Sequence, residues 1–132
     1  MKAKTNILCF VATVLLSATS CGRIFGSVVW LGPKLVTSDA QTVEFTPDRD
    51  CVVELISVYA TEYSSKDYDK VLTAEEIAFD GDTAIGKWAS VQYDGKKFIV
   101  TLTKSECQAR MLEIVFDDGG DAGGDIILYQ EI

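Results

Sequence analysis

The sequence predicts an all-β protein, an immunoglobulin-like antiparallel β-sandwich of about seven strands that follows a signal peptide. Three observations indicate this fold class. Apolar and polar residues alternate in short runs from Gln41 onward, turn-forming pairs such as Asp94-Gly95 separate the runs, and no segment sustains the 3.6-residue period of an amphipathic helix. A parallel sheet would need crossover helices, for which the sequence shows no pattern.

The N-terminal segment has the features of a bacterial lipoprotein export signal. Lys2 and Lys4 supply positive charge, and Ile7–Leu16 is an apolar run too short to span a bilayer comfortably. Small residues then precede Cys21, as in the lipobox, in which the cysteine is lipidated and becomes the new N-terminus. We therefore expect a lipid on Cys21 that tethers the protein to a membrane. Two alternatives stay open, an ordinary secretory signal cleaved after Ser20 and an uncleaved anchor.

The predicted organisation is a signal peptide at 1–20, a lipidated tether at 21–38 and the sandwich at 39–132. Loss of the signal removes Lys2 and Lys4, so that ten basic residues face twenty acidic ones and the formal charge changes from −8 to −10. A domain this acidic repels phosphate backbones. We therefore expect no nucleic-acid partner and no basic membrane-binding face.

The strands are expected where alternation or a β-rich run is clearest, at 42–45, 52–59, 77–79, 88–93, 98–103, 111–116 and 126–129. Asp94-Gly95 predicts a tight hairpin turn, because glycine accepts a positive φ freely. The apolar segment Val28–Leu31 is either a first edge strand or a segment laid on the sandwich. Thr73–Glu76 could open one helical turn with Thr73 as its cap.

Three aromatic residues are the candidate ligand-binding residues. Pyranose rings have apolar faces, which aromatic side chains beside polar groups can cover. Trp88 falls on the same side of the alternating run as Ser90, which allows a solvent or sheet-edge position, but a core or edge-covering position is the favoured alternative. Tyr63 and Tyr68 fall in the polar stretch Thr61–Thr73, which is either a recognition loop or a solvated insertion.

Cys51 and Cys107 are the two cysteines outside the signal and the lipidation site. In an exported domain they could form a disulfide that would contribute on the order of 4 kcal/mol. The sequence cannot show that their Cα atoms lie within bonding distance, so two reduced cysteines stay the alternative.

Catalysis, metals and cofactors are not expected. The chain has no histidine, and pairs of carboxylates arise by chance among twenty acidic residues. The glycine-rich acidic loop 117–125 lacks the spacing and closing glutamate of an EF-hand calcium loop. It therefore favours a solvated turn.

The C-terminal half resembles the BACON domain, the Bacteroidetes-associated carbohydrate-binding often N-terminal module. The resemblance rests on strand spacing and a few marker residues, namely Trp88–Val91, Asp94-Gly95, Phe98–Thr103, Arg110 and Ile126–Gln130. Two departures are Lys104–Cys107, where the family usually has an asparagine, and the long stretch Thr61–Thr73. The resemblance implies an exported immunoglobulin-like sandwich, often on lipoproteins, with a role in carbohydrate binding.

These features together predict a non-catalytic, lipid-anchored binding module of the bacterial cell envelope, with carbohydrate as a candidate ligand. The alternative is a structural or interaction lipoprotein that docks on another envelope protein. The residues after Cys21 (Gly22–Gly26) include no acid. That favours the periplasmic side of the outer membrane over the cell surface. The ligand and the oligomeric state stay open.

Overall fold

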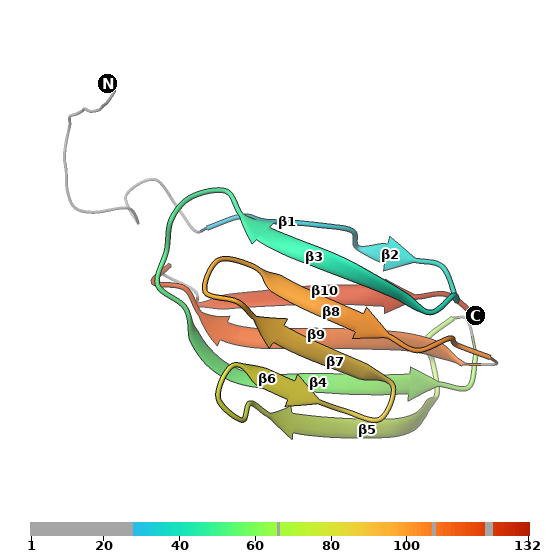
Figure 1. Ribbon diagram of the computed structural model, residues 1–132. Coiled ribbons are helices and arrows are strands. Elements are labelled where there is room, and N and C mark those ends of the chain that lie inside the picture. The colour runs from blue at the N-terminus through green and yellow to red at the C-terminus, as the bar shows by residue number, and fades with distance from the viewer. Residues whose placement is uncertain (1–27, 66, 107, 121–122) are drawn as a thin grey trace.

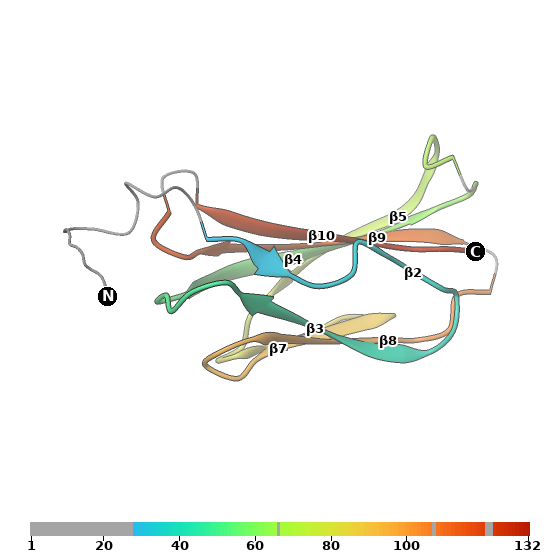
Figure 2. The ribbon, with the colours of Figure 1, turned by 90° about the horizontal axis from the view of Figure 1, so that it is seen from above.

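The computed structural model describes residues 28–65, 67–106, 108–120 and 123–132. The predicted signal peptide, Cys21 and Cys107 lie outside these residues. The predicted fold class is confirmed: the described chain forms two five-stranded sheets packed face to face (Figures 1 and 2). In this part of the chain, no helix has the length and apolar character needed to cross a membrane.

The first sheet contains five antiparallel strands in the order β1-β3-β8-β7-β6. Its strands are β1 (Trp30–Leu31), β3 (Gln41–Pro47), β6 (Thr83–Ile85), β7 (Ala89–Tyr93) and β8 (Phe98–Leu102).

The second sheet has the order β2-β10-β9-β4-β5. Its strands are β2 (Leu35–Val36), β4 (Glu54–Tyr63), β5 (Val71–Ala78), β9 (Ala109–Asp117) and β10 (Gly124–Gln130). All pairs are antiparallel except β2 with β10, which is parallel.

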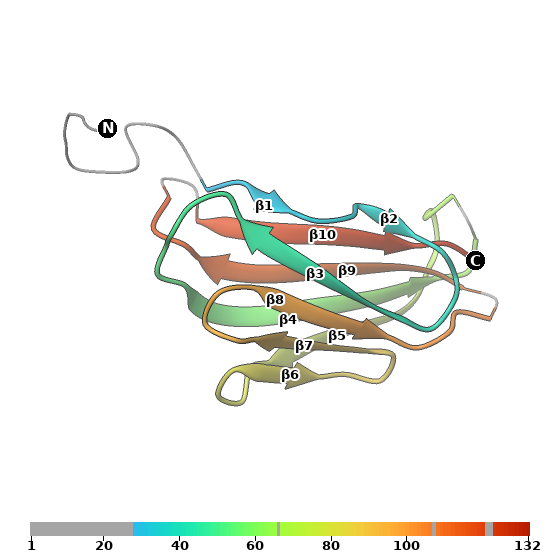
Figure 3. The same ribbon diagram turned by 45° about the horizontal axis from the view of Figure 1, so that its top comes forward.

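The strand order is that of an immunoglobulin-like sandwich. One sheet of that fold contains strands A, B, E and D, and the other contains G, F and C. Here β1, β3, β8 and β7 take the first set of positions and β10, β9 and β4 the second, with β5 beside β4 as an additional edge strand. The chain crosses between the sheets after β1, β2, β3, β5 and β8, as can be followed in Figure 3.

The described strands number ten, more than the seven or so expected from the sequence. The three additional strands, β1, β2 and β6, have only two or three residues each. Runs this short cannot display an alternating pattern, so the sequence offered β1 only as one of two alternatives for Val28–Leu31 and did not reveal β2 and β6.

The sandwich includes residues that the sequence assigned to the tether at 21–38. Trp30 pairs with Pro47 of β3, and Leu35 pairs with Tyr129 of β10, so the segment contributes one edge strand to each sheet. Of the two alternatives for Val28–Leu31, the edge strand is correct. The packing explains this position, because the Trp30 ring lies 5.1 Å from the ring of Phe98 in the core.

The stretch Thr61–Thr73, expected as a loop or insertion, is mostly a β-hairpin. β4 and β5 pair from Ser57 opposite Ala78 to Tyr63 opposite Val71, which leaves only 64–70 as the connection. The helical turn considered at Thr73–Glu76 is therefore wrong. Continuous pairing with β4 satisfies the backbone of this segment, and that pairing outweighs a weak local capping signal.

The core lies between the two sheets and is centred on aromatic rings. Phe98 of β8 and Phe116 of β9 are fully buried with ring centroids 4.9 Å apart, and Trp30 contacts both. The predicted Asp94-Gly95 hairpin is confirmed between β7 and β8. Gly95 adopts a φ of 95°, and the Asp94 carboxylate accepts hydrogen bonds from the backbone N–H groups of the two residues after Gly95.

Candidate binding surface

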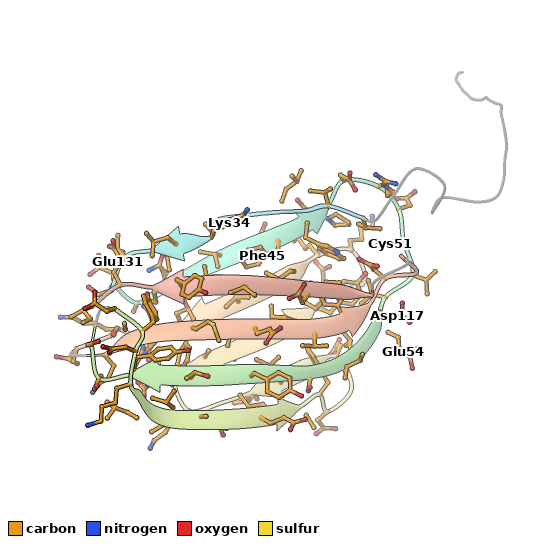
Figure 4. All side chains as sticks on the ribbon, turned by 180° about the vertical axis from the view of Figure 1, so that it is seen from behind. Lys34, Phe45, Cys51, Glu54, Asp117 and Glu131 are labelled. Atoms are coloured by element: carbon orange, nitrogen blue, oxygen red, sulfur yellow. The ribbon has the colours of Figure 1, made fainter. Side chains whose placement is uncertain are left out.

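The outer surface of the second sheet carries exposed apolar side chains; we call it the open face. In β9, Leu112, Ile114 and Phe116 are buried toward the core, so the alternate residues point outward. Figure 4 views the molecule from this side. Tyr59 and Ile127 keep 38% and 39% of their surface exposed on this sheet.

The register arranges the open face in cross-strand rows. Residues directly opposite each other on neighbouring strands have Cβ atoms about 4.5–5.5 Å apart, so each row is a line of side-chain contacts. Three rows run across the sheet: Ala78, Ser57, Val115 and Asp125; Glu76, Tyr59, Glu113 and Ile127; and Ala74, Thr61, Met111, Tyr129 and Leu35. The rows combine apolar, tyrosine and acidic side chains, with the polar residues Ser57 and Thr61 buried among them.

Charge is distributed unequally between the two sheets. The strands of the second sheet contain one basic residue, Arg110, and seven acidic residues: Glu54, Glu62, Glu75, Glu76, Glu113, Asp117 and Asp125. The strands of the first sheet contain a single charged residue, Glu44, whose carboxylate pairs with Lys97 at 3.0 Å. Among the strand residues, the acidic side chains are thus concentrated on the sheet that carries the open face.

Glu113 has an unusual environment on the open face. Burial disfavours its charged form and raises the pKa of its carboxyl. The negative charge of Asp125 and a side-chain hydrogen bond between the two carboxyls raise the pKa further. These groups lie one row apart on adjacent strands, because Asp125 pairs with Val115 and Ile127 pairs with Glu113.

Three tyrosines gather at the end of the open face where β4 joins β5. Tyr68, from the connecting loop, has its ring centroid 5.0 Å from those of Tyr63 and Tyr129. Between β4 and β10, Ala109 of β9 lies opposite Tyr63 of β4 and is fully buried. Tyr68 has a φ of 59°, and burial raises the pKa of its phenol.

The structure thus brings the two predicted residues Tyr63 and Tyr68 together and adds a third, Tyr129, which the sequence analysis missed. Its only sequence signal was its position two residues after Ile127, which places both side chains on the same face of a strand. The rings meet at 72° and 79°, so they do not form a flat platform. Beside them is an open hollow of about 420 Å³ lined by Leu35, Tyr68, Ala109, Glu131 and Ile132.

Trp88 is buried, with 5% of its surface exposed, so of the two alternatives it takes the core position and not the solvent or sheet-edge position. The residue precedes β7 and lies outside the strand whose parity suggested exposure. The guanidinium carbon of Arg110 lies 4.8 Å from the centroid of the Trp88 ring. This side chain therefore cannot present a free face to a sugar in this structure.

Arg110 links the two sheets through a polar network around Trp88. Its Nε donates to Glu62 Oε2 at 3.0 Å, and its Nη1 donates to Gln130 Oε1 at 3.1 Å and to the carbonyl oxygen of Thr103 at 3.0 Å. Arg110 and Gln130 are both buried. Since all these polar atoms are partnered, the network is a structural element of the fold.

The opposite end of the molecule carries the acidic loops. Figure 4 shows Cys51, Glu54 and Asp117 at this end, away from Glu131. Asp118, in the glycine-rich loop, is buried and accepts a hydrogen bond from the Trp30 indole N–H at 3.1 Å. Among the described residues, no group of three metal-ligating side chains is close enough to hold an ion.

Cys51 is half-buried and has a free thiol in the described structure. Burial and nearby aspartates raise the pKa of this thiol. The disulfide considered with Cys107 stays a prediction, because Cys107 lies outside the described residues.

The comparisons with known proteins bear on the fold alone. No family model matches the chain, and no curated protein matches it. An NMR structure of a protein from Bacteroides thetaiotaomicron is similar, with a TM-score of 0.56 and 14% identity over 79% of this chain and 86% of that one. Murine CRIg has a TM-score of 0.45 and 11% identity, over 80% of this chain and 96% of that one.

Proposed function

We propose that this protein is an exported, lipid-anchored and non-catalytic binding module that docks on another protein of the cell envelope through the open face. The observation that carries the proposal is the exposure of Tyr59, Ile127 and Leu35 on three strands of one sheet, β4, β10 and β2. Exposed apolar surface of this kind is typical of interaction sites, and tyrosine is enriched in them.

Two further observations favour a protein partner over a sugar. Sugar stacking needs an accessible aromatic face, whereas Trp88 is buried and the tyrosine rings meet edge to face. β5 is an edge strand whose outer side has no partner strand within the sheet, and Leu72 on it is half exposed. A protein partner can use such an edge as well as the face.

The membrane anchor in this proposal is a lipid on Cys21, on the periplasmic side of the outer membrane. The nine Cα–Cα steps from Cys21 to Trp30 can span at most about 32 Å, so the sandwich would stay close to the membrane. β1 starts at the end of the molecule that carries Asp48, since Val29 exchanges hydrogen bonds with that residue. The tyrosines lie at the other end. Mass spectrometry of the purified chain tests the anchor, because Cys21→Ser should abolish an acyl mass on the N-terminal peptide.

A matched pair of substitutions tests the docking function. Ile127→Asn changes the open face, and Ile85→Asn makes the same change on β6 of the first sheet, where the side chain is also exposed. We expect an envelope protein that is captured by the wild type and by Ile85→Asn but lost with Ile127→Asn. Mass spectrometry identifies the captured envelope protein. Once purified, that protein must bind directly to the wild type and to Ile85→Asn, and more weakly to Ile127→Asn. Equal capture by all three chains would contradict the proposal.

A glycan is the second candidate ligand, and the tyrosine cluster is the observation that favours it. Tyr63, Tyr68 and Tyr129 meet beside a hollow that Glu131 also lines, so aromatic and acidic groups converge there. Titration of plant, host and bacterial glycans against the isotope-labelled protein, followed by NMR, would detect binding. Saturable shifts confined to this cluster and lost in Tyr68→Ala would support a glycan, and no shift with any glycan would exclude this candidate.

A further inference from the structure

We propose that the open face recognises a basic protein segment by seating one arginine or lysine side chain over Tyr59, between Glu76 and Glu113. The inference rests on the proposed docking function and names the chemistry of the partner. It depends on three side chains that occupy one row of the second sheet.

The register places a carboxylate on each side of Tyr59. Glu76 of β5 and Glu113 of β9 are its direct cross-strand neighbours. Opposed Cβ atoms lie about 5 Å apart, so both glutamates are within reach of a cationic side chain seated over the ring. Tyr59 is 38% exposed, which leaves part of its ring accessible from solvent.

Neither glutamate has a basic partner among the described residues. The ion pairs in the described residues join Arg49 to Asp48, Lys97 to Glu44 and Arg110 to Glu62, and none includes Glu76 or Glu113. A cation over an aromatic face gains energy from the ring quadrupole, and two adjacent carboxylates add to it. The row therefore offers a cation three complementary groups at once.

The surroundings define the rest of the partner. Ile127 continues the row beyond Glu113, and Met111 and Val115 flank Glu113 on the same face of β9. A segment whose basic side chain has apolar neighbours would match this pattern. The raised pKa of Glu113 is consistent with a site that lacks its counter-ion, because a bound cation would offset the burial and the charge of Asp125.

The same charges argue against a second copy of this chain as the occupant. The strands of this sheet contain seven acidic residues, and their one basic residue, Arg110, is buried and paired with Glu62. Two such faces would bring like charges together without compensation. An acidic partner is disfavoured for the same reason.

Binding of three peptides to the full chain in detergent tests the inference. Each peptide has seven residues, with valine and threonine alternating around a central arginine, leucine or glutamate. Affinities are measured for the wild type, Glu113→Gln, Tyr59→Leu, Ile127→Asn and the control Glu44→Gln. The control removes the same charge from the first sheet, where Glu44 is exposed.

We expect the arginine peptide to bind at least about tenfold more tightly than the glutamate peptide, since both a cation–π contact and charge attraction discriminate between them. Glu113→Gln and Tyr59→Leu should each weaken the arginine peptide about threefold, and Glu44→Gln should change it less than twofold. Addition of the arginine peptide should also lower the pKa of Glu113 in an NMR titration, which a merely structural role of Glu113 would not produce.

The other outcomes overturn the inference in distinguishable ways. If the leucine peptide binds as tightly as the arginine peptide and Ile127→Asn weakens both, the open face docks partners but has no cation-binding position over Tyr59. If no peptide binds, the proposed cation-binding position over Tyr59 is wrong. If Ile127→Asn also leaves capture of the envelope protein unchanged, the docking function fails with it.

Discussion

Tyr68 lies edge to face against Tyr129, with ring centroids 5.0 Å apart, although one residue is in the β4–β5 loop and the other is on β10. The contact ties the loop to the sheet and covers the row that contains Ala109. Tyr68 also contacts Tyr63, so one side chain joins three segments of the chain.

Replacement of Tyr68 tests this contact. Tyr68→Ala should lower the free energy of unfolding by about 2 kcal/mol, because two aromatic pairs are lost. Tyr68→Gly should be less damaging by up to about 1 kcal/mol, since glycine adopts the φ of 59° without strain. Urea denaturation of both variants measures the difference. Alanine equal to or better than glycine at this position would contradict the left-handed conformation.

Arg110 should be among the most sensitive positions of the domain. Arg110→Met leaves Glu62 and Gln130 without their buried partner, and we expect a loss of about 3 kcal/mol in the free energy of unfolding. Lys97→Met breaks the exposed pair with Glu44 and should change stability by less than about 0.5 kcal/mol. Similar losses for both variants would show that the Arg110 network does not stabilise the fold.

The carboxyl of Glu113 predicts a pH dependence with a definite sign. Its pKa is raised in the folded state above the ordinary value of 4.5, so the folded protein holds this proton more tightly than the unfolded chain. That contribution to stability is complete below pH 4.5 and is lost as the pH rises through the folded pKa. The free energy of unfolding of Glu113→Gln should therefore decline less than that of the wild type as the pH rises from 4.5 through the folded-state pKa of Glu113.

A side-chain NMR titration checks the same prediction directly. Asp125→Asn should lower the pKa of Glu113 only part of the way toward 4.5, because burial is the larger cause and persists in the variant. A complete return to the ordinary value would contradict the dominant role of burial. An unchanged value would contradict the contact with Asp125.

Cys51 should react slowly with thiol reagents at neutral pH. Burial raises the pKa of its thiol first, and the charges of Asp118 and Asp50 raise it further. Alkylation of the folded protein should therefore be much slower than alkylation in urea. A mature chain that shows no thiol even in urea would instead support the disulfide with Cys107.

Much of the fold could be predicted from periodicity. Long strands with one buried face, such as β3, β8 and β9, alternate visibly, and Gly95 marks the hairpin between β7 and β8. The short strand β2 could not be recognised and β1 was only one of two alternatives for Val28–Leu31, because two residues carry no period. Their positions depend on the Trp30 ring and on the edge of β10, which are tertiary contacts.

The candidate surface was less accessible to sequence analysis for a related reason. The alternation of residues 88–93 left an outward-facing position open for Trp88. The residue precedes β7, however, and strand alternation does not apply there. Tyr129 joins Tyr63 and Tyr68 only because β10 and β4 flank β9, and neighbouring strands in a sheet cannot be read from local patterns. The row formed by Glu76, Tyr59 and Glu113 depends on the register in the same way.

Site-specific photo-crosslinking in living cells tests the central claim, the docking of a protein on the open face, most directly. A photoreactive phenylalanine derivative replaces Ile127 on the open face or, in the control, Ile85 on the first sheet; both native side chains are exposed. We predict a discrete adduct with one envelope protein from position 127 and none from position 85. No adduct at position 127, or the same adducts from both positions, would contradict the proposed docking face.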